Sequence, residues 1–244
     1  MLTHTNVPIE ELKVPHTTLF LLQSLDGKIS TGASDIFDID SDIPHLPHAS
    51  KGLGQFYDAE AETDSWSMVS GKTLAKLGIN ETLDALKYIK GLHRVIIGTS
   101  QLTKDGIENI IRQSENVVFI VTDERLNEHV RVVRLTRKYD NAAEFCVPKD
   151  NLEEAFLFLN SLGCEKITIQ TGGTVNASLI KQKLIDDVDV IIAPILVGGK
   201  NTPSLVDGDD RETINDLSTI GEMWMTGCES LRHSYLRVKY SVIK

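Results

Sequence analysis

Cysteine is scarce in this sequence, and its spacing excludes two kinds of site. Cys146, Cys164 and Cys228 lie far apart and form no C-x-x-C pair, so the sequence predicts neither a zinc site nor a disulfide framework. Residues 38–42 open like a calcium loop, but Ile43 stands where that loop needs glycine. The first 14 residues lack the apolar core of a leader peptide. We therefore expect no metal, a reducing compartment and a cytoplasmic location.

Positive charge is also in short supply. Lys and Arg number 25 against 35 Asp and Glu, a formal net charge of −10. Nucleic acids and anionic membranes are bound mainly by clustered Lys and Arg, so neither kind of partner is expected. No apolar run approaches membrane-spanning length. A P-loop and a G-x-S-x-G motif are absent as well, which leaves no activated nucleophile.

The length and composition favour one soluble α/β domain over residues 1–244. Of the 244 residues, 41% are hydrophobic and 25% charged, enough for a full core. Strand and helix patterns alternate, which predicts three layers: a mostly parallel central sheet with helices on both faces. The alternation of apolar and polar residues at the C-terminal end of the sequence predicts an antiparallel edge strand over residues 228–243. The other predicted strands are residues 17–23, 66–70, 94–98, 116–122 and 166–170, the longer predicted helices are 53–62 and 151–162, and 31–54 is a long, mostly polar stretch.

Two apolar runs each end in paired glycines, at Gly172-Gly173 and Gly198-Gly199. The first pair is followed by a helix-like segment. Glycines let backbone N–H groups approach a ligand closely, and a helix N-terminus adds the positive end of its dipole. We expect both pairs to hold phosphate groups, with tight turns as the alternative.

Three motifs in chain order carry a resemblance to a known family. They are SLDGKI (24–29), GGTVN (172–176) and LID (184–186) leading to PILVGG (194–199). Together they resemble the RibD C-terminal family of riboflavin biosynthesis, which has a dihydrofolate-reductase-like fold. The resemblance implies a homodimeric, NADPH-dependent reductase similar to 5-amino-6-(5-phosphoribosylamino)uracil reductase, which converts a ribosyl group into a ribityl chain. A dihydrofolate reductase-type enzyme and a catalytically inactive nucleotide-binding protein are the alternatives.

The same resemblance assigns roles to residues in four short segments. Asp26 and Lys28 would be catalytic: Asp26 or a water would donate the proton, and Lys28 would position the substrate, with Thr171 as a further substrate contact. An ordinary turn and a solvated lysine are the alternative for this segment. The alternative for Thr73 is a role in a helix cap. The alternative for residues 98–100 is an ordinary turn without a ligand. The cofactor contacts would be Ser24, Gly27, Gly71, Thr73, Gly98, Thr99, Ser100, Gly172, Gly173, Thr174, Val175 and Asn176, with Lys104 suited to a ribose 2′-phosphate.

The sequence departs from the family pattern where the substrate would bind. An acidic residue commonly precedes the first glycine pair in the family, and Thr171 stands there, after Gln170. Lys76-Leu77-Gly78-Ile79 replaces the usual D-D-P run and arginine, and the acidic segment 35–42 is longer than usual. No H-x-E followed by P-C-x-x-C, the deaminase signature of bifunctional members, occurs. The resemblance therefore supports cofactor binding more directly than the identity of the substrate.

Overall fold

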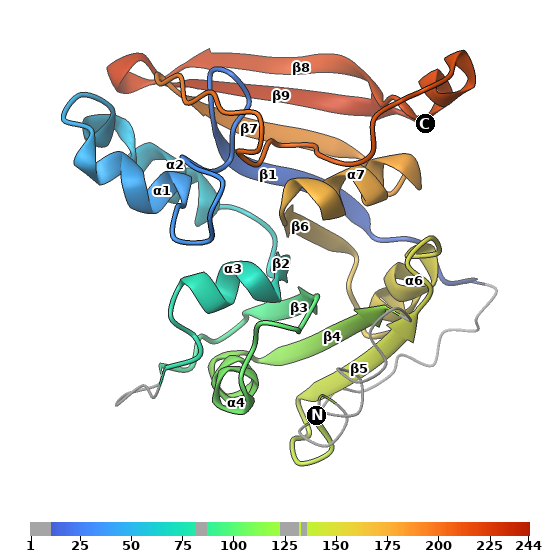
Figure 1. Ribbon diagram of the computed structural model, residues 1–244. Helices are drawn as coiled ribbons and strands as arrows, with labels where there is room; N and C mark the ends of the chain where they lie inside the picture. The colour runs from blue at the N-terminus through green and yellow to red at the C-terminus, as the bar shows by residue number, and fades with distance from the viewer. Residues whose placement is uncertain (1–10, 82–86, 123–131, 133–135) are drawn as a thin grey trace. The chain divides into compact units, whose positions relative to one another are not determined.

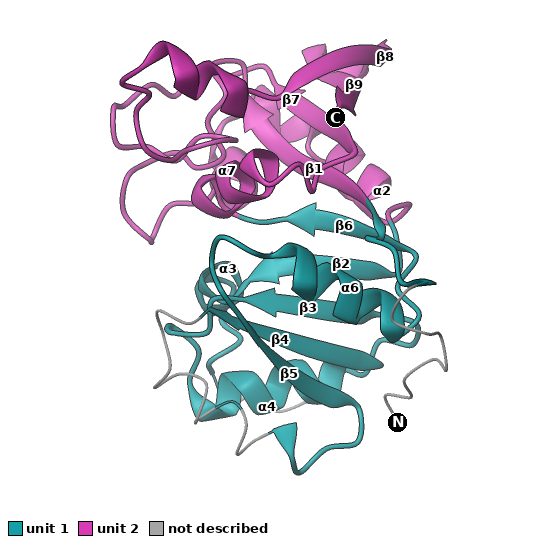
Figure 2. Ribbon diagram, turned by 90° about the vertical axis from the view of Figure 1, so that its right-hand side faces the viewer, with its two compact units in different colours: residues 1–16, 64–171 teal, residues 17–63, 172–244 magenta. Residues whose placement is uncertain are grey.

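The computed structural model describes residues 11–81, 87–122, 132 and 136–244, and Figure 1 shows the course of the chain. Contacts within the chain divide it into two compact units (Figure 2). Unit 1 comprises Met1–His16 and Asp64–Thr171, and unit 2 comprises Thr17–Thr63 and Gly172–Lys244. That the two units make one domain stays a prediction.

Unit 1 contains a five-stranded parallel sheet in the order β5-β4-β3-β2-β6. Its central strands are apolar on both sides, as expected where helices cover both faces of a parallel sheet. In β4, for example, the five residues from Val117 to Val121 are all buried. The strands are β2 (Trp66–Ser70), β3 (His93–Ile97), β4 (Asn116–Thr122), β5 (Ala142–Val147) and β6 (Lys166–Gln170).

Helices cover both faces of the unit 1 sheet. Helix α3 (Gly71–Lys76) and helix α4 (Lys104–Gln113) pack their apolar residues on Ile96 and Phe119. Helix α6 (Glu153–Ser161) stacks Phe158 on Phe145 of β5, with ring centroids 4.6 Å apart. Since Phe145 pairs with Ile120, the neighbour of Phe119 along β4, α6 lies on the opposite face. Unit 1 is therefore a three-layer α/β arrangement.

Unit 2 contains a mixed sheet. Strand β1 (His16–Ser24) pairs parallel with β7 (Asp187–Ala193), and β9 (Leu236–Ile243) then β8 (Glu222–Ser230) follow antiparallel. The predicted parallel sheet with an antiparallel C-terminal edge is confirmed. That edge consists of two strands, so the single strand predicted over residues 228–243 is wrong. The chain reverses with positive φ at His233 (58°) and Ser234 (66°), and neither residue is a glycine or proline that would signal a turn.

Helices also lie on both faces of the unit 2 sheet. Helices α1 (Ile39–Asp42) and α2 (Gly54–Glu60) contribute to a core with Phe20 and Ile191. Helix α7 (Gly173–Lys181) meets the other face, where Ile180 and Val242 line one small cavity. The predicted helix 53–62 and the helix after Gly172 are confirmed. Short 3-10 turns complete the unit at Ile43–His45, Ala49–Gly52, Ile214–Thr219 and Arg232–Ser234. The stretch 31–54 therefore contains α1 and two such turns.

One strand ends earlier than the apolar pattern indicates. The sequence predicts a strand that runs to Gly198-Gly199, but β7 stops at Ala193. Pro194 has no N–H to continue the ladder, and the Ile195 N–H turns back to the Ala193 C=O (2.8 Å). Residues 194–200 therefore form an irregular segment on which the candidate site depends.

Candidate functional site

The turn after β1 is held by its own hydrogen bonds. Ser24 ends β1 and is buried, and its N–H donates to the Lys28 C=O (N···O 2.8 Å). In return, the Lys28 N–H donates to the Ser24 hydroxyl (2.9 Å). Gly27 makes the turn with a φ of 77°, which residues with a Cβ rarely adopt. The predicted Asp-Gly turn is present, and it fixes the positions of Asp26 and Lys28.

The Asp26 carboxylate accepts three hydrogen bonds. The donors are the Ser24 hydroxyl (2.6 Å) and the backbone N–H groups of Val197 (3.0 Å) and Gly198 (2.6 Å). These bonds, the one from Ser24 foremost, lower the pKa of Asp26 to about 2, because they stabilise the ionised form. Asp26 is therefore a carboxylate near neutral pH, which argues against the proton-donor role. The Gly198 N–H, expected at a phosphate, is taken by Asp26.

The Lys28 side chain bonds further along the chain after β7, at Thr202 and Ser204. Its ammonium Nζ donates to the Thr202 C=O (2.9 Å) and to the Ser204 hydroxyl (3.1 Å). An ammonium has three N–H donors, so one donor remains for a ligand. Lys28 is half-buried and engaged with protein, unlike the solvated lysine that the sequence left as an alternative.

The N-terminus of α7 lies beside this segment. Gly172 is the N-cap residue, no side chain caps the helix, and its first turn contains no acidic residue. The N–H groups of Val175 (3.0 Å) and Asn176 (3.1 Å) donate to the Gly172 C=O, which leaves those of Gly173 and Thr174 for an anion. Val175 is half-buried and Thr174 exposed.

The two glycines before α7 differ in their surroundings. A Cβ built on Gly172 would meet no atom within 4 Å. On Gly173 it would collide with the Ser204 C=O and the Asp207 carboxylate. The residues present therefore fit a phosphate group at the open Gly172 side of the helix end. On the Gly173 side, the helix end packs closely against Ser204 and Asp207, and the Asp207 carboxylate places a negative charge there.

Asn176 is buried, and it anchors the helix instead of facing solvent. Its side-chain amide donates to the Leu205 C=O (2.7 Å). The Asp207 N–H donates to the Gly173 C=O (3.0 Å) in the same region. The predicted contact of Asn176 with a cofactor stays a prediction. One partner of its side chain in the structure is the backbone carbonyl of Leu205.

Five of the predicted cofactor residues lie in unit 1, at the ends of β2 and β3. Gly71 begins α3, and a Cβ on it would collide with the Gly98 C=O. Thr73 donates its N–H to the Ser70 side chain (3.1 Å), and the two hydroxyls lie 2.8 Å apart. The helix-cap alternative for Thr73 is therefore present, with Ser70 as the cap. Of the other predicted residues there, Gly98 has a φ of 71°, Thr99 is buried and Ser100 is exposed.

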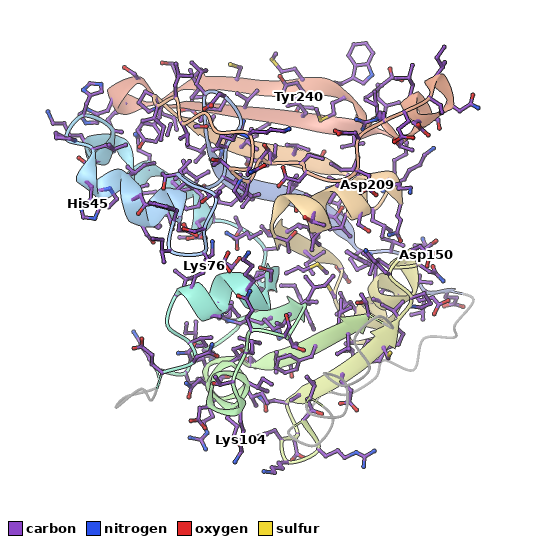
Figure 3. The ribbon with its side chains drawn as sticks, viewed as in Figure 1. His45, Lys76, Lys104, Asp150, Asp209 and Tyr240 are labelled. Atoms are coloured by element: carbon purple, nitrogen blue, oxygen red, sulfur yellow. The ribbon has the colours of Figure 1, made fainter. Side chains whose placement is uncertain are left out.

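Two further predicted residues also belong to unit 1. Thr171 follows β6 and is buried. Lys104 is the first residue of α4 and is exposed (Figure 3). Their predicted contacts with substrate and with a ribose 2′-phosphate stay predictions.

In unit 2 the structure connects parts of the three motifs that carried the resemblance, whereas Leu184 and Asp186 of the third motif bond to Thr17 instead. The turn 24–28, the start of α7 and the segment after β7 are joined by the hydrogen bonds described above. Sequence reasoning missed Thr202, Ser204 and Asp207, which make several of these connections. Their only signal is a polar run directly after the second glycine pair.

Two further features concern the part of the chain that the structure describes. There, no group of three or more His, Cys, Asp and Glu residues is placed to hold a metal ion. No helix there is both long and apolar enough to cross a membrane.

Two curated relatives carry the same name, 2,5-diamino-6-ribosylamino-4(3H)-pyrimidinone 5′-phosphate reductase. The protein of Methanothermobacter thermautotrophicus is 38% identical over 209 residues, which is 83% of this chain and 88% of the relative. That of Archaeoglobus fulgidus is 31% identical over 93 residues, which is 37% of this chain and 42% of the relative. The chain thus spans less than half of the second relative.

The chain is also similar to a solved structure and matches a family model. The structure of a pyrimidine reductase-like protein from Corynebacterium diphtheriae superimposes with a TM-score of 0.61 at 14% identity, covering 98% of this chain and 96% of that protein. At this identity the likeness shows the fold alone, which is the one seen here. The family model of the RibD C-terminal domain matches residues 15–226. The chain belongs to the RibD C-terminal domain family.

Proposed function

We propose that this protein is an NADPH-dependent reductase of the riboflavin-biosynthesis type, acting on a ribosylaminopyrimidine 5′-phosphate. The observation that carries the proposal is the meeting of the turn 24–28 and the start of α7 on one hydrogen-bonded segment. The relatives named as pyrimidinone phosphate reductases support the substrate class. The reaction adds one hydride and one proton to the ribosyl group and yields a ribityl chain.

In this proposal, different residues of unit 2 would bind the cofactor and orient the substrate. The open side of Gly172 and the first N–H groups of α7 would hold a phosphate group of the cofactor. A bound NADPH supplies the hydride. Lys28 would use its third N–H to orient a polar group of the substrate. Because Asp26 is ionised, the proton comes from water in this proposal.

Calorimetric titration with NADPH and, separately, NADH tests the cofactor. We expect NADPH to bind roughly tenfold or more tightly than NADH, because a 2′-phosphate adds at least one charge-assisted hydrogen bond. Equal affinities would contradict the preference for NADPH. If neither nucleotide binds, the reductase proposal is wrong.

Turnover tests the substrate class. NADPH oxidation is followed at saturating cofactor with the 2,5-diamino-pyrimidinone, with the corresponding amino-uracil, and with dihydrofolate as a control. Oxidation with a ribosylaminopyrimidine supports the proposal. Turnover of dihydrofolate alone would instead identify a dihydrofolate reductase-type enzyme. Tight NADPH binding with no turnover of any of them would identify an inactive nucleotide-binding protein.

We also propose a homodimer, with the outer strand β8 as its contact surface. Among the residues that the structure describes, strand β8 pairs on one side only, with β9. It exposes Met223, Trp224 and Met225, and Trp224 is 72% exposed. Exposed apolar residues on an edge strand are typical of association surfaces. The cytoplasmic location remains a prediction from the sequence.

The dimer proposal predicts that Trp224→Glu yields a monomer. A charge in the centre of an apolar contact costs several kcal/mol if it is left unpaired, on the order of 2–5 kcal/mol, so the mass measured by light scattering should halve. Ile214→Glu is the matched control, because Ile214 is also exposed, 84%, but lies outside β8. A wild-type monomer, or a dimer that survives Trp224→Glu, would contradict this surface.

A further inference from the structure

A segment after β7 is fastened to both halves of the candidate site. We call residues 197–207 the strap. At its start, the N–H groups of Val197 and Gly198 donate to Asp26. Further along, its backbone bonds to the turn: the Ile29 N–H donates to the Pro203 C=O (3.0 Å), and the Leu205 N–H donates to the Gly27 C=O (3.0 Å). The strap therefore follows the turn along its length.

The far end of the strap is fastened to α7. Asn176 donates to the Leu205 C=O (2.7 Å), and the Asp207 N–H donates to the Gly173 C=O (3.0 Å). The Asp207 carboxylate accepts the Ser204 N–H with both oxygens (3.1 and 3.2 Å), which closes the end of the strap. Gly173 packs directly against it. A displacement of the strap must therefore disturb the start of α7.

Asp26 is the charged group that holds the exposed start of the strap. Gly198 is exposed and Val197 only half-buried, so their N–H groups would otherwise face water. Gly198 and Gly199 have positive φ angles of 73° and 83°, a conformation that glycine adopts without steric cost but does not hold by itself. We call Asp26 with its bonds to Val197 and Gly198 the clamp. The Ser24 hydroxyl accepts a hydrogen bond from the Lys28 N–H and donates one to Asp26, which links the clamp to the turn.

We propose that Asp26 is a positioning residue that acts through the strap: it fixes the strap against the turn and thereby orders the start of α7 for the phosphate of the cofactor. Lys28 performs the same task at Thr202 and Ser204. The role in cofactor binding rests on the proposed function. The role in holding the strap does not, and it can be tested without any ligand.

Hydrogen exchange of the free protein tests the clamp. The two carboxylate oxygens of Asp26 accept hydrogen bonds from three donors. In Asp26→Asn an NH2 group replaces one of these oxygens, so at least one donor then faces another donor instead of an acceptor. We expect the amides of Val197 and Gly198 to exchange roughly tenfold faster or more in this variant, since a hydrogen bond to a charged group is lost. Asp209→Asn is the matched control, because Asp209 is exposed and lies just after the strap. Unchanged exchange in Asp26→Asn would overturn the clamp.

A second variant tests the clamp independently of Asp26. Lys28→Met should speed exchange of the amides of Thr202, Ser204 and Leu205 and spare those of Val197 and Gly198. Lys200→Met, on the exposed part of the strap, is its control. Local changes in both variants, with unchanged unfolding midpoints, support the proposal. Unchanged exchange in the strap in Lys28→Met would overturn the part assigned to Lys28, and changes that arise only through global unfolding in both variants would overturn the clamp.

Steady-state kinetics separate positioning from acid catalysis. For Asp26→Asn we expect the KM for NADPH to rise roughly tenfold or more, with kcat changed by less. A general acid would instead lower kcat by roughly 10² to 10⁴ with KM unchanged, and its titration would disappear from the pH profile of the variant. That second result would overturn positioning. A wild type that binds no NADPH would refute the proposed function, whereas the exchange data would still decide the clamp.

Discussion

Replacing Gly172 by valine is expected to abolish most NADPH binding and to leave folding intact. A Cβ on Gly172 meets no atom within 4 Å, and its φ of −76° and ψ of 161° suit any residue. The valine side chain would therefore fit the protein and occupy the space in front of α7. Loss of the charge-assisted hydrogen bonds to one phosphate costs about 2 kcal/mol or more, roughly thirtyfold in Kd.

Calorimetry with NADPH and thermal unfolding of the same samples measure the two halves of this prediction. Gly54→Val is the matched control, because Gly54 also has open space around it and stands at the start of α2. Gly173→Val is the contrasting variant: its Cβ would strike the Ser204 C=O, so it should lower stability as well as affinity. An unchanged affinity in Gly172→Val would contradict a phosphate at this helix end.

The sequence predicted most strands of the parallel part of the fold because their signals are local, but it missed β5 and helix α4. Strands such as β1 and β4 are apolar runs bounded by polar residues, and α7 starts where the glycine pair ends the preceding strand. The errors arose where pairing overrides local pattern. Pro194 stops β7 although apolar residues continue beyond it, and the alternation after Cys228 conceals the turn between β8 and β9.

The candidate site was harder to predict because its partners are distant in the sequence. Asp26 looks like an acid next to a turn. Besides the nearby Ser24 hydroxyl, the main groups that lower its pKa are the N–H groups of Val197 and Gly198, about 170 positions later. The two glycine pairs look alike in sequence, yet Gly172 faces open space while Gly198 donates to Asp26. Only the tertiary arrangement separates a ligand-facing N–H from one that is used within the protein.

The stretch 31–54 follows the turn 24–28 directly, so its anchoring bears on the site. Tyr235, fully buried just before β9, supplies that anchor. Its hydroxyl donates to the Ala49 C=O (2.8 Å), and a Cβ on Gly52 would lie 2.5 Å from its ring. Burial raises the pKa of Tyr235 to about 12, so the hydroxyl stays a donor throughout the neutral and mildly alkaline range.

Removing this side chain is expected to produce the largest loss of stability among the changes considered. Truncating a buried aromatic residue to alanine costs about 3 to 5 kcal/mol, and Tyr235→Ala also leaves the Ala49 C=O without its donor. Tyr235→Phe keeps the ring and loses only the hydrogen bond, so it should cost about 1 kcal/mol. Urea unfolding followed by circular dichroism measures both.

The comparison of the two variants shows what the ring itself contributes. If Tyr235→Ala and Tyr235→Phe lose the same small amount of stability, the ring does not anchor the stretch 31–54, and the packing against Gly52 carries little energy. If the alanine variant loses several times more, the ring is the anchor. Faster hydrogen exchange should then be confined first to residues 43–60, whose buried side chains share the core with Tyr235.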